Sequence, residues 1–253
     1  MESGGPPIDV LVATFNSAAT LDAALEAARR HLPVHRIIVV DRSSTDGTPE
    51  IAHRWGAEVY PDEVGLGYAR NLALQLADTD PVLFLDSDVI ISRPDFYARA
   101  REAYQAPRTA AVVGMTAGHR FQYGFPLGLT MVGRRWALAA DIPDSVQSRE
   151  TYYLQRAARQ AGLRVRYVPE AMEHRGTYRS APNWPEFQGA AIRTTSGVNP
   201  RELLYALLVI QLIHMNSGRP RDLFYTPIFF SKLVRGFLDP ARWGRLDRRR
   251  VRV

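Results

Sequence analysis

Two aspartates, Asp86 and Asp88, follow the apolar run VLFL (82–85) and precede a second apolar run, VII (89–91). The first run has the length and composition of a buried strand, so both carboxylates stand where that strand should end. Alternate residues of an extended backbone point to the same side, so the two carboxylates can act together. Such a pair either caps a turn or holds a positive group, and its oxygens suit Mg²⁺ or Mn²⁺.

Polar residues also mark the ends of the other strands expected early in the chain. Asn16 follows the apolar segment 8–15, which ends in Phe15, and Asp41 ends the apolar segment 36–41. Helical segments alternate with these strands, a pattern that predicts a mostly parallel sheet with helices on both faces. Ligands of such sheets bind beyond the carboxyl ends of the strands. One acid at a strand end is usually a turn or cap residue, but polar clusters at three ends favour a ligand crevice.

The composition narrows the class of protein. The chain has 253 residues, 46% hydrophobic and 23% charged, enough for one large α/β domain with or without an appendage. It contains no cysteine, which excludes disulfides, thiolate metal sites and cysteine nucleophiles. The net charge is +6 and Lys232 is the only lysine. Arginine suits phosphate recognition, although a GC-rich genome would produce the same bias.

Two other ligand classes are disfavoured. We find no alternation of basic and aromatic residues typical of a single-strand platform, so we expect no nucleic-acid partner. The segment GLG (65–67) is not a dinucleotide fingerprint and does not follow the first strand, which argues against a nicotinamide dehydrogenase.

The pattern predicts three regions: a flexible leader over 1–7, an α/β domain over 8–200 and C-terminal apolar helices over 201–253. The apolar segment 202–215 is too short to cross a bilayer, and 223–238 is rich in aromatic residues. With the basic end of the chain, these helices suit an anionic membrane surface. The alternatives are ordinary core packing, or a chain cut short of true membrane spans.

The order of four segments resembles the family 2 glycosyltransferases with the GT-A fold: VATFN (12–16), IIVVDRSSTDGT (37–48), GLGYARN (65–71) and FLDSDV (84–89). Segments 129–135 and 148–176 resemble the acceptor-side region of that family, so the resemblance covers about residues 8–176. It implies an α/β fold with a doubly wound, mixed sheet. It also implies an inverting hexosyltransferase that uses Mn²⁺ or Mg²⁺. A looser resemblance extends to polyprenol-phosphate mannosyltransferases and cellulose-synthase-like proteins.

The same resemblance implies roles for particular residues. Asp41 would recognise the nucleotide base, and Asp86, Asp88 and His174 would lie at the metal. The residues expected to bind the nucleotide sugar are Ala13, Thr14, Phe15, Asn16, Asp41, Gly67, Arg70, Asn71, Asp86 and Ser87.

The sequence departs from the family pattern at two places. Arg42 stands where relatives usually have a second acid, so the identity of the nucleotide base stays open. GDP-mannose and UDP-glucose are both candidate donors. Glu150-Thr151 stands where relatives often have Glu-Asp, and Thr151 cannot act as a base. Glu150 and Asp144 are the candidate bases, although Glu150 also suits the first turn of a helix on electrostatic grounds.

Whether the enzyme needs a catalytic base depends on the chemical class of the acceptor. A sugar hydroxyl needs a base to take its proton, whereas a lipid phosphate is already an anion and needs cationic partners instead. The expected acceptor is lipid-linked, either a saccharide or a polyprenyl phosphate, at the cytoplasmic face of the cell membrane. Candidate acceptor residues, which could equally form a solvated basic face, are His119, Arg120, Arg134 and Arg135. The alternative function is a non-catalytic GT-A protein that binds a nucleotide sugar or a glycan.

Overall fold

The computed structural model describes residues 5–119, 125–175, 183–216 and 220–243. The chain forms two compact units. Unit 1 comprises Met1–Ala117, Gly124–Ser145 and Glu150–Gly176, and unit 2 comprises Gly118–Tyr123, Val146–Arg149 and Thr177–Val253. This division differs from the expected boundary at 200, because helix α7 (Trp184–Ser196) groups with the C-terminal helices. The start of the expected leader (1–4) and the end of the basic tail (244–253) lie outside the described residues.

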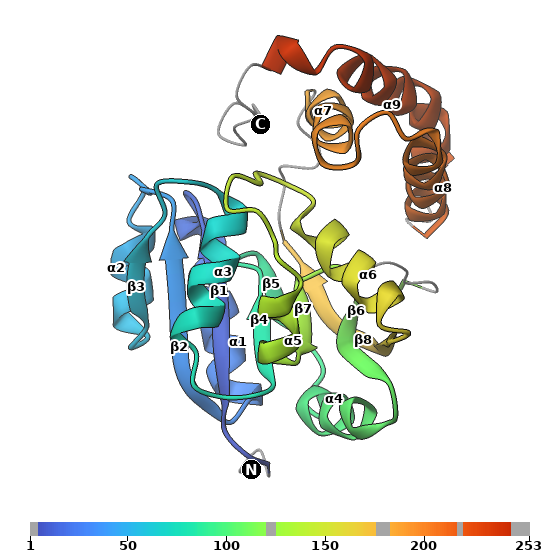
Figure 1. The fold of residues 1–253 in the computed structure, drawn as a ribbon. Coiled ribbons are helices and arrows are strands. Elements are labelled where there is room, and N and C mark those ends of the chain that lie inside the picture. Colours follow the sequence, from blue (N-terminus) through green and yellow to red (C-terminus); the bar gives the residue numbers. More distant parts are fainter. Residues whose placement is uncertain (1–4, 120–124, 176–182, 217–219, 244–253) are drawn as a thin grey trace. The chain divides into compact units, whose positions relative to one another are not determined.

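Unit 1 contains an eight-stranded mixed sheet in the order β3-β2-β1-β4-β7-β6-β8-β5 (Figure 1). The first four of these strands run parallel, β7 is antiparallel to both its neighbours, and β6 pairs in parallel with β8. The strands are β1 (Ile8–Thr14), β2 (Val34–Asp41), β3 (Glu58–Pro61), β4 (Val82–Leu85), β5 (Val89–Ile91), β6 (Thr109–Thr116), β7 (Leu129–Val132) and β8 (Arg164–His174).

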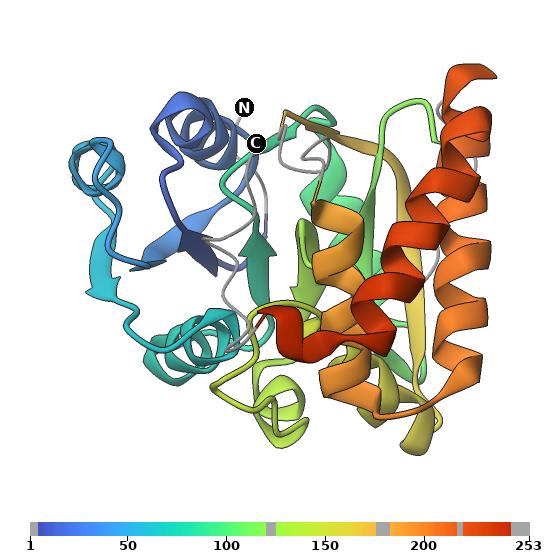
Figure 2. The ribbon, with the colours of Figure 1, turned by 90° about the horizontal axis from the view of Figure 1, so that it is seen from above.

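Helices cover both faces of this sheet, and β1 shows why. Its alternate residues Val10 and Val12 pack in one core, which includes Leu21 of helix α1 (Ala18–His31). Leu11 packs in the other core, which includes Leu74 of helix α3 (Leu66–Leu76). Figure 2 shows α1 and α3 on opposite sides of the strands. The helices of unit 1 are α1 (Ala18–His31), α2 (Thr48–Arg54), α3 (Leu66–Leu76), α4 (Phe96–Gln105), α5 (Arg134–Ala139) and α6 (Glu150–Gln160).

The parallel register brings several strand ends to one edge, here named the carboxyl edge. Thr14 of β1 lies beside Asp41 of β2, and Asp41 lies beside Pro61 of β3. On the other side of β1, Leu11 pairs with Phe84 of β4. The residues that follow these strands therefore share the carboxyl edge, as ligand sites of parallel sheets require.

Unit 2 is helical. Helix α7 meets α9 (Pro220–Leu238) at two glycines: a Cβ on Gly189 would lie 1.8 Å from the Leu233 carbonyl oxygen, and one on Gly236 would lie 1.9 Å from that of Glu186. Helix α8 (Pro200–Asn216) and a short 3-10 turn, Pro240–Trp243, complete the unit. The two apolar segments of the sequence are thus helical, as expected. Among the described residues, no helix combines the length and the apolar character needed to cross a bilayer.

Candidate active site at the carboxyl edge

Asp41 joins β1 to the loop that follows β2. Its Oδ1 accepts hydrogen bonds from the hydroxyls of Thr14 and Ser44, both at 2.6 Å, and its Oδ2 accepts one from the Ser44 amide at 2.8 Å. Only 5% of Asp41 is exposed. The acid predicted to recognise the base is therefore held rigidly by its own fold.

The loop after β1 is tied to both neighbouring loops. The Asn16 amide donates to Ser44 Oγ at 2.8 Å, and Asn16 Oδ1 accepts from the Thr45 amide at 3.0 Å. Ser17 Oγ lies 2.9 Å from Oγ of Ser87, which lies between the two aspartates. The adjacent Phe15 ring is exposed. These contacts join the predicted nucleotide residues of β1 and β2 to the Asp86–Asp88 turn.

Asp46 stabilises the start of α1 at the same edge. Its Oδ2 accepts from the Ala18 amide at 3.0 Å, and its Oδ1 accepts from the Thr48 hydroxyl. Burial raises the pKa of Asp46, but the hydrogen bonds from Thr48 and Ala18 outweigh burial and set that pKa below its usual value. The carboxylate is therefore charged at neutral pH and complements the positive end of the helix dipole.

Asp62 is a site-edge residue that the sequence analysis missed. It follows β3 and is 2% exposed; its Oδ1 accepts from the amides of Val64 and Gly65 at 2.8 and 2.7 Å. Its Oδ2 accepts from Arg42 Nη1 at 3.2 Å. The signal was present in the sequence, because Asp62 follows a predicted strand closely, as Asp86 does. The acid expected after Asp41 is thus replaced by an arginine that pairs with an acid from the next strand.

Arg70 of α3 contacts both Asp86, a predicted metal and nucleotide-sugar residue, and Glu150, a candidate catalytic base. Its Nη2 donates to Asp86 Oδ1 at 2.8 Å. The same nitrogen lies 3.8 Å from Oε1 of Glu150 and forms an ion pair with it. Its guanidinium carbon lies 5.1 Å from the centroid of the Phe84 ring. Only 4% of Arg70 is exposed, and its Nε and Nη1 have no hydrogen-bond partner among the described residues. Buried N–H groups without acceptors are costly, so this guanidinium is suited to an anionic ligand.

Asp88 and His174 converge although they lie far apart in the sequence. Strand β5 pairs with the end of β8, which sets Val89 opposite His174. His174 Nε2 then lies 3.5 Å from Asp88 Oδ1. A carboxylate beside an imidazole fits a divalent cation that takes its remaining oxygens from phosphate. The contact joins two of the three predicted metal ligands, and the assignment of Asp86, Asp88 and His174 to a metal stays a prediction.

The two candidate bases have different surroundings. Asp144 is exposed, and its Oδ1 accepts from Asn71 Nδ2 at 2.8 Å, while its carbonyl accepts from the Tyr68 amide at 3.1 Å. Glu150, by contrast, is buried at the start of α6 and faces Arg70. Asp144 therefore ties its loop to α3, whereas Glu150 lies beside Arg70, which also contacts Asp86; the choice of the catalytic base stays a prediction.

Gly67 and Asn71 both contact that loop, and their predicted role in binding the nucleotide sugar stays a prediction. A Cβ on Gly67 would lie 2.1 Å from the Pro143 carbonyl oxygen, so no other residue fits there without movement. Asn71 Nδ2 also donates to the Ile142 carbonyl at 2.7 Å. Both residues hold residues 142–144 against α3.

Two of the predicted acceptor residues, Arg134 and Arg135, do not lie at the carboxyl edge. Arg134 and Arg135 follow β7, whose Val132 pairs with Val82 at the start of β4, so they lie at the opposite edge of the sheet. Arg134 donates from Nε to the Leu74 carbonyl at 2.7 Å and thereby caps α3. The prediction overlooked that β7 runs antiparallel to β4. His119 groups with unit 2, and Arg120 lies outside the described residues.

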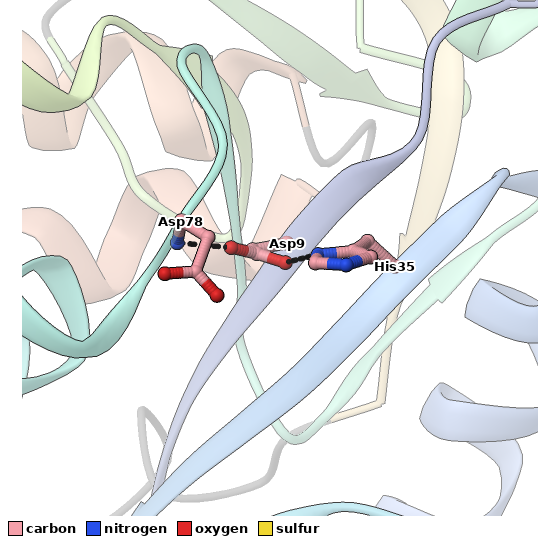
Figure 3. A group of neighbouring side chains, drawn as sticks. All are labelled: Asp9, His35 and Asp78. Atoms are coloured by element: carbon pink, nitrogen blue, oxygen red, sulfur yellow. Dashed lines mark hydrogen bonds and ion pairs between the residues drawn. The ribbon is translucent and has the colours of Figure 1, made fainter.

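A second charged cluster, Asp9, His35 and Asp78, lies at the amino ends of β1 and β2 (Figure 3). Their potential ligand atoms lie within 4.8 Å of one another. Asp9 Oδ1 lies 2.9 Å from His35 Nδ1, and Oδ2 accepts from the amides of Asp78 and Thr79 at 2.6 and 3.0 Å. Since protein donors engage both oxygens, we interpret this cluster as a structural tie between β1, β2 and the turn before β4.

Comparison with known proteins agrees with this architecture. Residues 9–168 match the profile of glycosyl transferase family 2. A protein of Bacillus subtilis (strain 168) described as glycosyltransferase EpsH is 30% identical over 98 residues. That match covers 36% of this chain and only 28% of the relative, so the chain spans well under two thirds of that protein's length.

Two solved structures share the fold. The mannosyltransferase PcManGT from Pyrobaculum calidifontis, in complex with GDP-Man and Mn²⁺, is 17% identical with a TM-score of 0.69, over 94% of this chain and 88% of that one. Glucosyl-3-phosphoglycerate synthase from Mycobacterium tuberculosis, in complex with Mn²⁺, UDP and glucosyl-3-phosphoglycerate, is 21% identical with a TM-score of 0.60, over 78% and 82% of the two chains. The predicted GT-A fold is thereby confirmed. Because the family profile covers more than half of its length, the chain belongs to glycosyl transferase family 2.

Proposed function

We propose that this enzyme is an inverting, metal-dependent hexosyltransferase that moves mannose or glucose from a nucleotide-diphosphate sugar to a lipid-linked acceptor. The observation that carries the proposal is the meeting, at one sheet edge, of the Asp86–Asp88 turn with His174 and the buried guanidinium of Arg70. Cationic and metal-ligating groups in one place are what a diphosphate leaving group requires.

The donor side of the site would hold a divalent cation and the diphosphate. Asp88 and His174 would ligate Mn²⁺ or Mg²⁺, with Asp86 beside them; the metal, when bound, neutralises charge on the leaving diphosphate. The complexes of the two structural relatives with Mn²⁺ support this choice. Arg70 holds Asp86 in place, and its Nε and Nη1 supply donors for an anionic group.

The acceptor side would use Glu150 where the acceptor is a saccharide. The acceptor hydroxyl oxygen forms the new bond to the anomeric carbon while the bond from that carbon to the diphosphate breaks, and Glu150 takes the hydroxyl proton. Attack from the side opposite the leaving group inverts the anomeric centre. A polyprenyl phosphate would need no base, and Glu150 would then only position Arg70.

The lipid-linked acceptor and the cytoplasmic membrane surface belong to the same proposal. Leu204 and Leu208 are exposed one turn apart on α8, and Ile228 is exposed on α9. The sequence that follows these helices is rich in arginine. Exposed apolar side chains in a chain whose following sequence is basic suit an anionic lipid surface.

The test is a transfer assay on the full chain. UDP-glucose and GDP-mannose, each labelled in the sugar, are supplied with Mn²⁺ and either polyprenyl phosphate in micelles or phosphoglycerate in solution. We expect labelled lipid product, lost on chelation of the metal. Transfer to phosphoglycerate alone would overturn the lipid acceptor. Binding of a nucleotide sugar without any transfer would instead favour the non-catalytic alternative.

A further inference from the structure

We propose that this site selects a uracil-type base over guanine, and that the hydrogen bonds of Thr14 and Ser44 to Asp41 make the selection. The inference rests on the proposed function, since it concerns the nucleotide of the donor. It decides between the two donor classes that the sequence and the family leave open.

The argument begins with the lone pairs of Asp41. An ionised carboxylate offers about four acceptor positions, two on each oxygen. Oδ1 already accepts two short hydrogen bonds, from the Thr14 and Ser44 hydroxyls, and Oδ2 accepts one from the Ser44 amide. One position, on Oδ2, is left for a ligand. The near-complete burial of Asp41 prevents the side chain from turning to offer more.

The neighbouring acid cannot supply the missing acceptor. Asp62 Oδ1 accepts from two backbone amides, and its Oδ2 accepts from Arg42. Asp62 is also buried almost completely. At the position after Asp41, where another acid would add acceptors, the chain has Arg42, which is a donor only. The described part of this edge therefore presents one carboxylate acceptor position rather than a pair.

The two bases differ in the number of donors they present. Uracil has one ring N–H, flanked by two carbonyl groups, so one acceptor satisfies it. Guanine presents a ring N–H and an adjacent amino group, which together need two acceptors side by side. The Asn16 side chain, whose Oδ1 is engaged by the Thr45 amide, keeps its NH₂ group as a donor that a carbonyl of either base could accept, so the discrimination rests on the acceptor positions. A guanine amino group desolvated without an acceptor lowers affinity strongly.

The experiment compares nucleotides by calorimetry on the full chain with Mn²⁺. UDP, GDP and IDP are titrated, because the base of IDP keeps the ring N–H of guanine but lacks its amino group. We expect UDP to bind about tenfold or more tighter than GDP, and IDP to fall between them. GDP binding as tight as UDP, or IDP no better than GDP, overturns the inference while leaving the transferase intact. Binding of none of the three overturns the proposed function as well.

The variant Thr14→Val tests the cause. It keeps the shape of the side chain and frees one acceptor position on Asp41 Oδ1, so the preference for UDP over GDP should fall at least about fivefold. Ser44→Ala should act in the same direction. The matched control is Thr109→Val, whose hydroxyl donates to the Ala106 carbonyl far from this edge, and it should leave the preference unchanged. An unchanged preference for UDP over GDP in folded Thr14→Val would overturn the inference. If that variant does not fold, the order of the UDP, IDP and GDP affinities of the wild type tests the inference instead.

Discussion

The carboxyl edge of the sheet in unit 1 and the opposite edge, where β1 to β4 begin and which is here named the amino edge, both carry charged side chains. The two edges differ in how these side chains are paired. At the amino edge, charged groups satisfy one another: Arg36 donates to both oxygens of Glu58 at 2.7 Å and to Asp78 at 2.6 Å. At the carboxyl edge, Arg70 is almost fully buried, and two of its nitrogens have no hydrogen-bond partner in the part of the chain that the structure describes. Among the described residues, the charged groups at the amino edge pair with one another, whereas the carboxyl edge keeps buried N–H donors suited to an added anionic ligand. The following variants test that contrast.

The largest effect is expected at Asp88. Asp88→Ala should lower transfer about 1000-fold, or ~4 kcal/mol, because the metal would lose a ligand, and metal-dependent nucleotide binding should disappear. The thermal midpoint should stay near that of the wild type. The amino-edge control is Asp78→Ala, which removes a mostly exposed acid and should leave transfer unchanged. Wild-type turnover in Asp88→Ala would remove the metal assignment.

At the amino edge the corresponding loss is one of stability. Asp9→Ala leaves the amides of Asp78 and Thr79 without their acceptor and should lower the free energy of unfolding by about 3 kcal/mol. Urea denaturation measures the loss. His35→Ala should cost less, since that ring is half exposed. Nucleotide affinity of the folded protein should not change; a changed affinity would mean that the two edges are coupled.

Two matched arginine variants separate the edges directly. Arg70→Lys should lower kcat/KM about 30-fold, or ~2 kcal/mol, because one ammonium group cannot reproduce the planar contact with Asp86 near Glu150. Its stability should change little, since two unpartnered N–H groups disappear. Arg36→Lys should show the reverse, with lower stability and unchanged transfer. Steady-state kinetics measure the loss of transfer, and urea denaturation measures the loss of stability, in both variants. Equal losses in the two variants would contradict the contrast between the edges.

The smallest effect is a pH dependence of the amino edge. Hydrogen bonds from Arg36 and then Tyr60 lower the pKa of Glu58 to about 2 from its ordinary 4.5. The folded pKa lies below the unfolded one, so this stabilisation is present above pH 4.5 and is lost as the pH falls towards 2. Because the side chain is 42% exposed, solvent screening reduces the contribution to about 1 kcal/mol. The free energies of unfolding of the wild type and Glu58→Gln should differ at pH 6 and converge near pH 2; a constant difference would contradict the assignment.

Much of the carboxyl edge was predictable because the relevant patterns are local. Apolar runs of strand length, each followed by a polar residue, placed Asp41, Asp86 and Asp88 at strand ends, and the structure agrees. The same reasoning applied to β3 would have found Asp62. The boundary between the two units was less predictable, since the grouping of α7 with α9 depends on close contact at Gly189 and Gly236.

The sequence by itself determined the elements, the fold class and the strand-end acids, because the alternation and spacing that produce them act over a few residues. Only the tertiary structure decided which groups meet. Strand β7 runs antiparallel to β4, which places Arg135 at the edge away from the acids, and the β5–β8 pairing brings His174 to Asp88. Strand direction and order depend on packing between distant segments, and no local pattern encodes them. The filled acceptor positions of Asp41 likewise follow from contacts between β1 and the loop after β2.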